Sequence, residues 1–154
     1  MKAIAAMSEN RVIGNKGQIP WRISNDFKWF KEFTFNKTIL VGSNTYKTLP
    51  ILPNRKILVL SNKLNDTWYN AATDTSMASV CWDEAYALGK TREIIIAGGA
   101  KVYSLFLPQI TEFYVTHIKG EYEGDAFMPP FEHLFSKQEV VKTFGEHKVV
   151  KYAK

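Results

Sequence analysis

Short apolar runs recur along this chain, and segments with helical character separate most of them. Strands are predicted at 2–7, 38–41, 56–60, 93–97 and 112–117, followed by a pair at 138–144 and 147–152. Helices are predicted at 25–35, from 43 to just before Pro50, and at 82–88 and 100–107. Strands that alternate with helices predict a mostly parallel central sheet flanked by helices on both faces. The fold class is α/β, and the last strands add an antiparallel C-terminal edge.

Local residues indicate where several of these elements begin and end. Ser24 and Ser43 are suitable N-caps, and Gly89 is expected to end the helix before it. The polar residues 62–77 are predicted to form a loop. Residues 8–23 are predicted to form a second long loop that contains two glycines, and structureless loops of this length are often functional.

Composition excludes several classes of protein. The 154 residues are 45% hydrophobic and 23% charged, as expected for one folded domain. The single cysteine, Cys81, excludes an intrachain disulfide and is interpreted as a small packed residue. No apolar run is long enough to span a membrane, and the run 3–7 is too short for a signal-peptide core. We therefore expect a cytoplasmic protein without a membrane partner.

The net charge and the motif content limit the classes of binding partner that we expect. A net charge of +5 suits an anionic ligand, and because no dense basic block is present, nucleic acid is not expected as a partner. Phosphate-loop, dinucleotide-fingerprint and hydrolase motifs are absent. The three histidines lack ligand spacing, so no metal site is expected. Ligands of parallel sheets bind beyond the carboxyl ends of strands, which points to the residues after Met7, Val41, Leu60 and Ala97.

Asp26 is the candidate functional residue that remains after these motif searches. It lies in the first turn of a helix, on the same face as Trp29, Phe30 and Phe33. One interpretation is an ordinary acid that complements the helix dipole. The other is a carboxylate on the floor of an apolar pocket, where desolvation would raise its pKa and where it could hold an amidine-like ligand or manage a proton.

Six segments resemble one enzyme family. They begin at Asn10-Arg11-Val12-Ile13-Gly14 and Ile19-Pro20-Trp21 with Asp26, and continue through 41–46, 52–56, 96–103, 114–118 and 123–125. In this order and spacing they resemble dihydrofolate reductase, and they cover the chain to about residue 130. The resemblance implies a single domain over 1–154 that contains an adenosine-binding subdomain at about 37–91. It also implies NADPH-dependent reduction of dihydrofolate to tetrahydrofolate, and we expect a monomer.

The resemblance assigns roles to individual residues of the substrate site. Asp26 would pair with the pterin and support protonation at N5, and Thr116 would hydrogen-bond to Asp26. Arg55 would bind the glutamate carboxylate of the substrate, although a solvated turn charge is the simpler interpretation of that residue alone. The implied catalytic set is Asp26, Trp21, Thr116 and Tyr103, and the implied substrate-binding set adds Ile4, Ala6, Phe27, Phe30, Leu49, Leu52 and Arg55.

The resemblance also implies a cofactor site and a lid. In the family a cis peptide joins the glycines that correspond to Gly98 and Gly99, which would let the pyrophosphate approach a helix start. Loop 8–23 would close over the site, with Asp125 hydrogen-bonded to its backbone between Gly14 and Lys16. The implied cofactor residues are Ala6, Ile13, Gly14, Ile19, Gly42, Ser43, Asn44, Thr45, Leu60, Ser61, Asn62, Lys63, Gly98, Gly99, Ala100, Lys101, Val102 and Tyr103.

The sequence departs from the family pattern at several positions. Ser43 stands where an arginine commonly contacts the 2′-phosphate of the cofactor, so NADH use remains open beside NADPH, with Lys63 and Lys101 as substitute cations. Ala97 replaces a larger aliphatic residue, and the last two strands are joined by a short turn around Gly145. Two other functions remain as alternatives: the related reductase of riboflavin synthesis, and a non-catalytic scaffold with a nucleic-acid partner.

Overall fold

The structure is a computed structural model, and it describes residues 1–50, 52–61 and 66–154. The larger sheet contains β1 (Lys2–Ser8), β3 (Thr38–Gly42), β4 (Lys56–Leu60), β5 (Thr67–Asn70), β6 (Thr75–Val80), β7 (Ile94–Ile96), β8 (Glu112–Ile118), β10 (Lys137–Phe144) and β11 (His147–Ala153). A two-stranded sheet pairs β2 (Val12–Gly14) with β9 (Ala126–Phe127). The helices are α1 (Ser24–Thr34), α2 (Ser43–Thr48), α3 (Trp82–Thr91) and α4 (Ala100–Phe106), with 3₁₀ turns η1 (Leu107–Gln109) and η2 (Glu132–Leu134).

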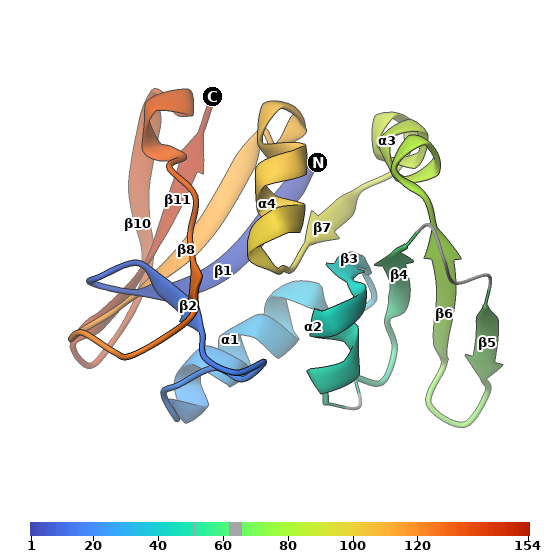
Figure 1. The fold of residues 1–154 in the computed structure, drawn as a ribbon, viewed down its shortest axis with the longest axis horizontal. Coiled ribbons are helices and arrows are strands. Elements are labelled where there is room, and N and C mark those ends of the chain that lie inside the picture. Colours follow the sequence, from blue (N-terminus) through green and yellow to red (C-terminus); the bar gives the residue numbers. More distant parts are fainter. Residues whose placement is uncertain (51, 62–65) are drawn as a thin grey trace.

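The strands of the larger sheet are ordered β10-β11-β8-β1-β7-β3-β4-β6-β5 (Figure 1). The pairs from β8 through β1, β7, β3 and β4 to β6 are parallel. The remaining pairs, β8–β11, β11–β10 and β6–β5, are antiparallel. The mostly parallel α/β sheet and its antiparallel C-terminal strands are therefore confirmed.

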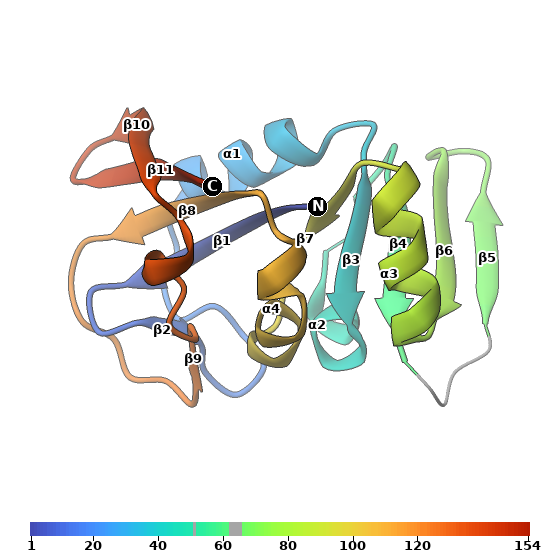
Figure 2. The same ribbon diagram turned by 90° about the horizontal axis from the view of Figure 1, so that it is seen from above.

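The central strands are buried on both faces, which explains why they appear in the sequence as continuous apolar runs. In β3, Leu40 contributes to the core beneath α3 and α4, while its neighbours Ile39 and Val41 contribute to the core beneath α1. Figure 2 shows α1 on the opposite side of the sheet from α3 and α4. Each face therefore has its own core, and both cores converge on β1, β7 and β3.

Several sequence predictions are wrong in detail. The segment 62–77, predicted as loop, contains β5 and the start of β6 within its described part. Helix α3 continues past Gly89 to Thr91, and α1 and α2 are capped by Ile23 and Gly42 rather than by the predicted serines. The predicted long loop contains β2. The Met1 side chain packs directly on Gly89, where an added Cβ would lie 2.2 Å from the Met1 Cε atom.

The two edge strands of the sheet differ in chemistry. Strand β10 carries Lys137, Glu139 and Lys142, and its register shifts between Val140 and Lys142. Charges and bulges of this kind discourage pairing with another chain. The opposite edge, β5, has the uncharged sequence Thr-Trp-Tyr-Asn, and all four residues are exposed.

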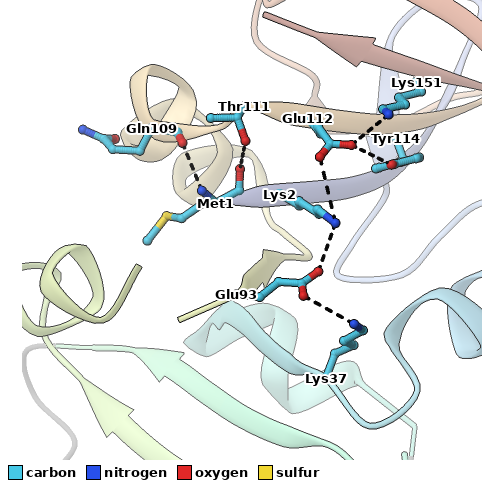
Figure 3. Close-up of polar contacts among 9 residues, drawn as sticks. All are labelled: Met1, Lys2, Lys37, Glu93, Gln109, Thr111, Glu112, Tyr114 and Lys151. Atoms are coloured by element: carbon cyan, nitrogen blue, oxygen red, sulfur yellow. Dashed lines mark hydrogen bonds and ion pairs between the residues drawn. The ribbon is translucent and has the colours of Figure 1, made fainter. Parts of the chain in front are cut away.

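A chain of ion pairs crosses the amino ends of the strands (Figure 3). The Lys37 ammonium lies 3.4 Å from Glu93, which also contacts Lys2 at 3.1 Å. Lys2 in turn approaches Glu112 at 3.9 Å, and Glu112 pairs with Lys151 at 3.0 Å. These side chains are partly exposed, so each pair contributes at most about 1 kcal/mol. In the described residues, no helix is long and apolar enough to cross a membrane.

Candidate active site

The carboxyl ends of the central strands bring distant segments into contact. The Gly42 N–H at the end of β3 donates to the Gly98 carbonyl at 2.9 Å, just beyond β7. The Ala97 N–H donates to the Leu40 carbonyl, also at 2.9 Å. Ala6, near the end of β1, is half-buried in the neighbouring strand. The residues that follow Val41 and Ala97 therefore lie together at the carboxyl ends of their strands, as the parallel topology requires.

Asp26 occupies the first turn of α1 and is largely withdrawn from solvent. Desolvation raises the pKa of its carboxyl above the ordinary value. The Trp21 indole N–H donates to Asp26 Oδ2 at 3.4 Å and opposes that rise by stabilising the charged form. The balance leaves the carboxyl more basic than a surface aspartate, a property common in groups that hold or transfer protons.

Thr116 approaches the same carboxyl from β8. Its hydroxyl lies close enough to lower the pKa of Asp26, although less than Trp21 does. Thr116 is fully buried, and its Oγ1 has no hydrogen bond of regular geometry within the described residues. A buried hydroxyl without a partner is costly. Its position beside Asp26 marks a place where a further polar group would be favourable.

Tyr103 of α4 contacts β1. It is buried, and its hydroxyl donates to the Ile4 carbonyl at 2.7 Å. Burial raises the pKa of Tyr103, and the charge on Asp26 raises it further, so the phenol stays protonated. The ring also packs against Phe113, with a centroid separation of 5.5 Å. Both Tyr103 and the Ile4 backbone, which were singled out in the sequence, therefore belong to one buried contact.

The segment at the start of α4 contains a cis peptide between Gly98 and Gly99. A Cβ at Gly99 would lie 3.1 Å from Thr45 Oγ1, and one at Gly42 would lie 3.2 Å from Val102 Cγ2. The backbones of 42–45 and 98–102 therefore approach closely because their glycines lack side chains. Around them, Ser43 and Ala100 are half-buried, while Asn44 and Lys101 are exposed.

The residues expected along the substrate channel differ in their exposure to solvent. Phe27 is exposed and Phe30 half-buried, with their rings stacked at 6.5 Å. Leu49 is half-buried against the core beneath α1, and Leu52 is a member of that core with 1% of its surface exposed. The structure therefore places Leu52 in the hydrophobic core.

Arg55 is buried rather than solvated, so the simpler sequence interpretation of a surface turn charge is wrong. Its guanidinium donates to the carbonyls of Pro53 and Lys31, and Nε donates to Thr34 Oγ1 at 3.3 Å. Burial lowers the pKa of Arg55, but an arginine remains charged at any ordinary pH. These contacts use three of the five N–H donors and fix the plane of the group.

Asp125 is bonded to the backbone of the loop between β2 and α1. Both of its carboxylate oxygens accept from the Lys16 N–H, at 3.2 and 3.1 Å. The Asp125 N–H donates to the Gly14 carbonyl at 3.1 Å. Ile13 and Gly14 are half-buried beside this contact, and Ile19 is largely exposed farther along the loop.

Two residues that hold this loop were not singled out by sequence reasoning as site residues. Arg11 donates to the carbonyls of Met128 and Pro129 and pairs with Glu132 at 2.6 Å. Gly124 packs so tightly on the loop that a Cβ there would lie 2.3 Å from Val12 Cγ1. Both residues occur inside motifs quoted from the sequence, but their partners are more than 100 residues away, and no local signal identifies them.

The adenosine end of the expected site is only partly described. Leu60 is half-buried at the end of β4, and the Ser61 N–H donates to the Val80 carbonyl at 2.9 Å. Asn62 and Lys63, which were also expected to bind the cofactor, lie outside the described residues.

The chain matches the dihydrofolate reductase family over residues 1–152. It belongs to that family. A relative from Buchnera aphidicola subsp. Baizongia pistaciae is 35% identical, and the match covers 96% of this chain and 88% of the relative. One from Neisseria meningitidis serogroup A is 36% identical, with 88% and 82% covered. Both relatives are dihydrofolate reductases.

The fold also resembles that of a solved dihydrofolate reductase. The structure of dihydrofolate reductase from Enterococcus faecalis, complexed with NADP(H) and RAB-propyl, superposes with a TM-score of 0.80 at 29% sequence identity. The match covers 99% of this chain and 94% of that one. The present chain is therefore an enzyme, an oxidoreductase that acts on CH–NH groups.

Proposed function

We propose that Asp26, Tyr103, Thr116 and the two glycine segments together carry the reaction of the family, the NADPH-dependent reduction of 7,8-dihydrofolate to tetrahydrofolate. The observation that carries this assignment is the carboxyl of Asp26. It lies in a desolvated position beside Trp21 and Thr116, and its pKa is raised by burial. A carboxyl beside aromatic side chains suits a flat heterocycle that carries an amidine edge.

Asp26 would orient the pterin through paired, charge-assisted hydrogen bonds to the ring N3–H and the 2-amino group. A carboxyl with a raised pKa also holds a proton closer to neutral pH, and it supports delivery of that proton to N5 through water. Trp21 fixes the carboxyl through its indole N–H. The unpaired hydroxyl of Thr116 would complete the polar group around Asp26.

The apolar residues Phe27, Phe30 and Leu49 would pack along the substrate. Arg55 would receive the carboxylate of its glutamate. Its guanidinium plane is fixed by three contacts. Among the described residues these contacts leave two of its five N–H donors, which is the number a bidentate carboxylate contact needs. Leu52 would support this region from the core.

The cofactor site fits the chain at the two glycine segments. The backbones at Gly42 and Gly98–Gly99 are joined by a hydrogen bond, and Thr45 and Val102 pack against these glycines. A diphosphate would approach the main chain of these two segments. Ala6, Ile13, Ile19 and Tyr103 would border the nicotinamide, and residues 43–45, 60–61 and 100–102 would surround the rest. NADPH supplies the hydride when bound.

The loop between β2 and α1 would act as a lid that excludes water from the reacting atoms. Its hydrogen bonds with Asp125 at Gly14 and Lys16 support one held position of that lid. Asp125 is thus a positioning residue in this proposal.

The test compares Asp26→Asn with a matched acid. Asp83 also lies in the first turn of a helix, but at an exposed position of α3. Oxidation of NADPH by dihydrofolate is followed by absorbance, in parallel with NADH. Asp26→Asn should lower kcat/KM by about 100-fold or more at neutral pH and leave NADPH binding intact, because general acid–base groups contribute that much. Asp83→Asn should retain full activity.

Full activity in Asp26→Asn would overturn the role of this carboxyl. Absence of turnover in the unmodified protein, when it is folded and binds neither ligand, would instead support the scaffold alternative. The ratio of NADPH to NADH turnover measures what the uncharged Ser43 costs in recognition of the 2′-phosphate.

We also propose that the protein acts in the cytoplasm as a monomer, with residues 37–91 as its adenosine-binding part. The single cysteine suits a reducing compartment. Sedimentation at assay concentration tests the monomeric state.

A further inference from the structure

A hollow of about 360 Å³ lies between the C-terminal end of α3 and the face of the sheet. Its floor is apolar and includes Leu58 of β4, Ala78 of β6, Leu88 of α3 and Ile94 of β7. Figure 2 shows α3 over β4, while β6 and β5 extend beyond it. The hollow forms because the helix covers only part of the sheet. Its volume is at the small end of the range found for ligand sites in proteins.

The hollow is remote from the active site. Thr38, Lys56 and Ile94, which line it, are the first residues of β3, β4 and β7, and Ser76 is the second residue of β6. The hollow therefore lies at the amino ends of these strands, whereas the proposed substrate and cofactor sites lie at their carboxyl ends. It also opens on the face covered by α3, opposite the face that carries α1 and Asp26.

Two cations border the hollow from different elements. Lys56 is exposed at the start of β4, and Arg92 is exposed at the C-cap of α3. Within the described part of the chain, neither side chain forms an ion pair or a hydrogen bond. The nearest acid in sequence, Glu93, is already shared between Lys2 and Lys37. Asp74 accepts from the Tyr69 hydroxyl at 3.1 Å. The positive charge at the rim is therefore not neutralised locally.

Hydroxyl groups complete the lining. Thr38, Thr67, Ser76 and Tyr69 contribute to the wall, and Ser76 is paired with Lys56 across β4 and β6. The side chains of Lys56, Leu58, Ser76 and Ala78 belong to the same face of the sheet, since they occupy alternate positions in register. An apolar floor beneath two unpaired cations and several hydroxyls combines the features that bind an amphiphilic anion.

We propose that this hollow is a second ligand site, which binds a small carboxylate with a flat apolar body. The body would lie on Leu58, Ala78 and Leu88, and the carboxylate would face Lys56 and Arg92. Arg92 suits this role because its planar guanidinium matches a carboxylate in two parallel hydrogen bonds. The site is independent of catalysis, because none of its residues belongs to the active site.

The experiment uses para-trifluoromethylbenzoate as the probe and fluorine NMR as the readout. The full-length protein is first saturated with folate and NADP⁺, so that the probe has no access to the active site. The neutral isostere para-trifluoromethylbenzamide is titrated in parallel. The variants are Lys56→Gln, Arg92→Gln and the double variant. Lys90→Gln is the matched control, because Lys90 is on the same helix but lies over the Tyr86 ring, 4.4 Å from its centroid.

The benzoate should bind to the saturated protein at millimolar concentration or below, and more tightly than the benzamide. Each single variant should weaken binding about two- to fivefold and the double variant about tenfold, because ion pairs at exposed sites are individually weak. Lys90→Gln should have no effect. Turnover should be unchanged in every variant, which also reports that all of them fold.

Three results would overturn the proposal. The first is an absence of benzoate binding at millimolar concentration. The second is equal binding of the benzamide and the benzoate. The third is a double variant that binds the benzoate as the unmodified protein does, which would place the probe elsewhere on the surface.

Discussion

The hydroxyl of Tyr103 provides a measure of how tightly α4 is joined to β1. Substitution Tyr103→Phe keeps the ring and its packing on Phe113, and removes only the hydrogen bond of 2.7 Å to the Ile4 carbonyl. Because the contact is buried, the loss includes the cost of leaving a carbonyl without this donor. We expect the free energy of unfolding to fall by about 1–2 kcal/mol.

For a chain of this length, that loss corresponds to a decrease in Tm of about 3–6 °C. The control is Tyr114→Phe, whose hydroxyl donates to Glu112 at 2.9 Å in a partly exposed position. Water replaces that partner, so the control should lose less than about 0.5 kcal/mol. Urea unfolding and calorimetry of the three proteins measure both quantities. Equal losses in the two variants, or none in Tyr103→Phe, would refute the reasoning that burial sets the cost.

Three further predictions concern the site and its loop. Since burial raises the pKa of Asp26, the folded protein keeps this proton to higher pH than the unfolded chain, and stability falls as the pH rises from the unfolded pKa through the folded one. Urea titrations should therefore show Asp26→Asn to be more stable than the unmodified protein at neutral pH, and a lower stability would contradict the direction of the shift. In Gly124→Ala, the new Cβ would lie 2.3 Å from Val12 Cγ1 and 2.6 Å from the Gly14 carbonyl, so the variant should lose about 1–3 kcal/mol of stability and also lose turnover. Ser43→Arg should raise the preference for NADPH over NADH about tenfold in steady-state assays, and an unchanged ratio would show that other cations already bind the 2′-phosphate.

The sequence was sufficient to predict the sheet's centre because the strands there are buried on both faces. The runs 39–41 and 94–97 within these predicted strands have no polar residue, and their burial in two cores accounts for that pattern. The edge strands β5 and β6 were not predicted, because an apolar run marks a strand only where both of its faces are buried. Strand β5 is exposed throughout, and in β6 a serine lies between the buried Met77 and Val80, so neither strand carries an apolar run. Their pairing depends on β4, which local sequence does not reveal.

The candidate site divides in a similar way. Asp26 could be found because an acid among aromatic residues at helical spacing is itself a local signal. The burial of Arg55 could not be found, since it depends on carbonyls at Lys31 and Pro53 that the fold brings around the guanidinium. Gly89 was predicted to end a helix, but α3 continues to Thr91, and the contact of Met1 with Gly89 comes from the far end of the chain segment 1–89, which local sequence does not reveal.

The position of β1 has a consequence for the order in which the protein is made. Strand β1 leaves the ribosome first, yet it pairs with β7 and β8, where Lys2 is opposite Ile95 and Glu112. Both neighbours are synthesised more than 90 residues later. The sheet therefore lacks its middle until most of the chain is available, and β3 and β4 can pair before β1 does. A nascent chain that stalls before β8 leaves an apolar strand unpaired, which makes synthesis the period of greatest exposure to aggregation.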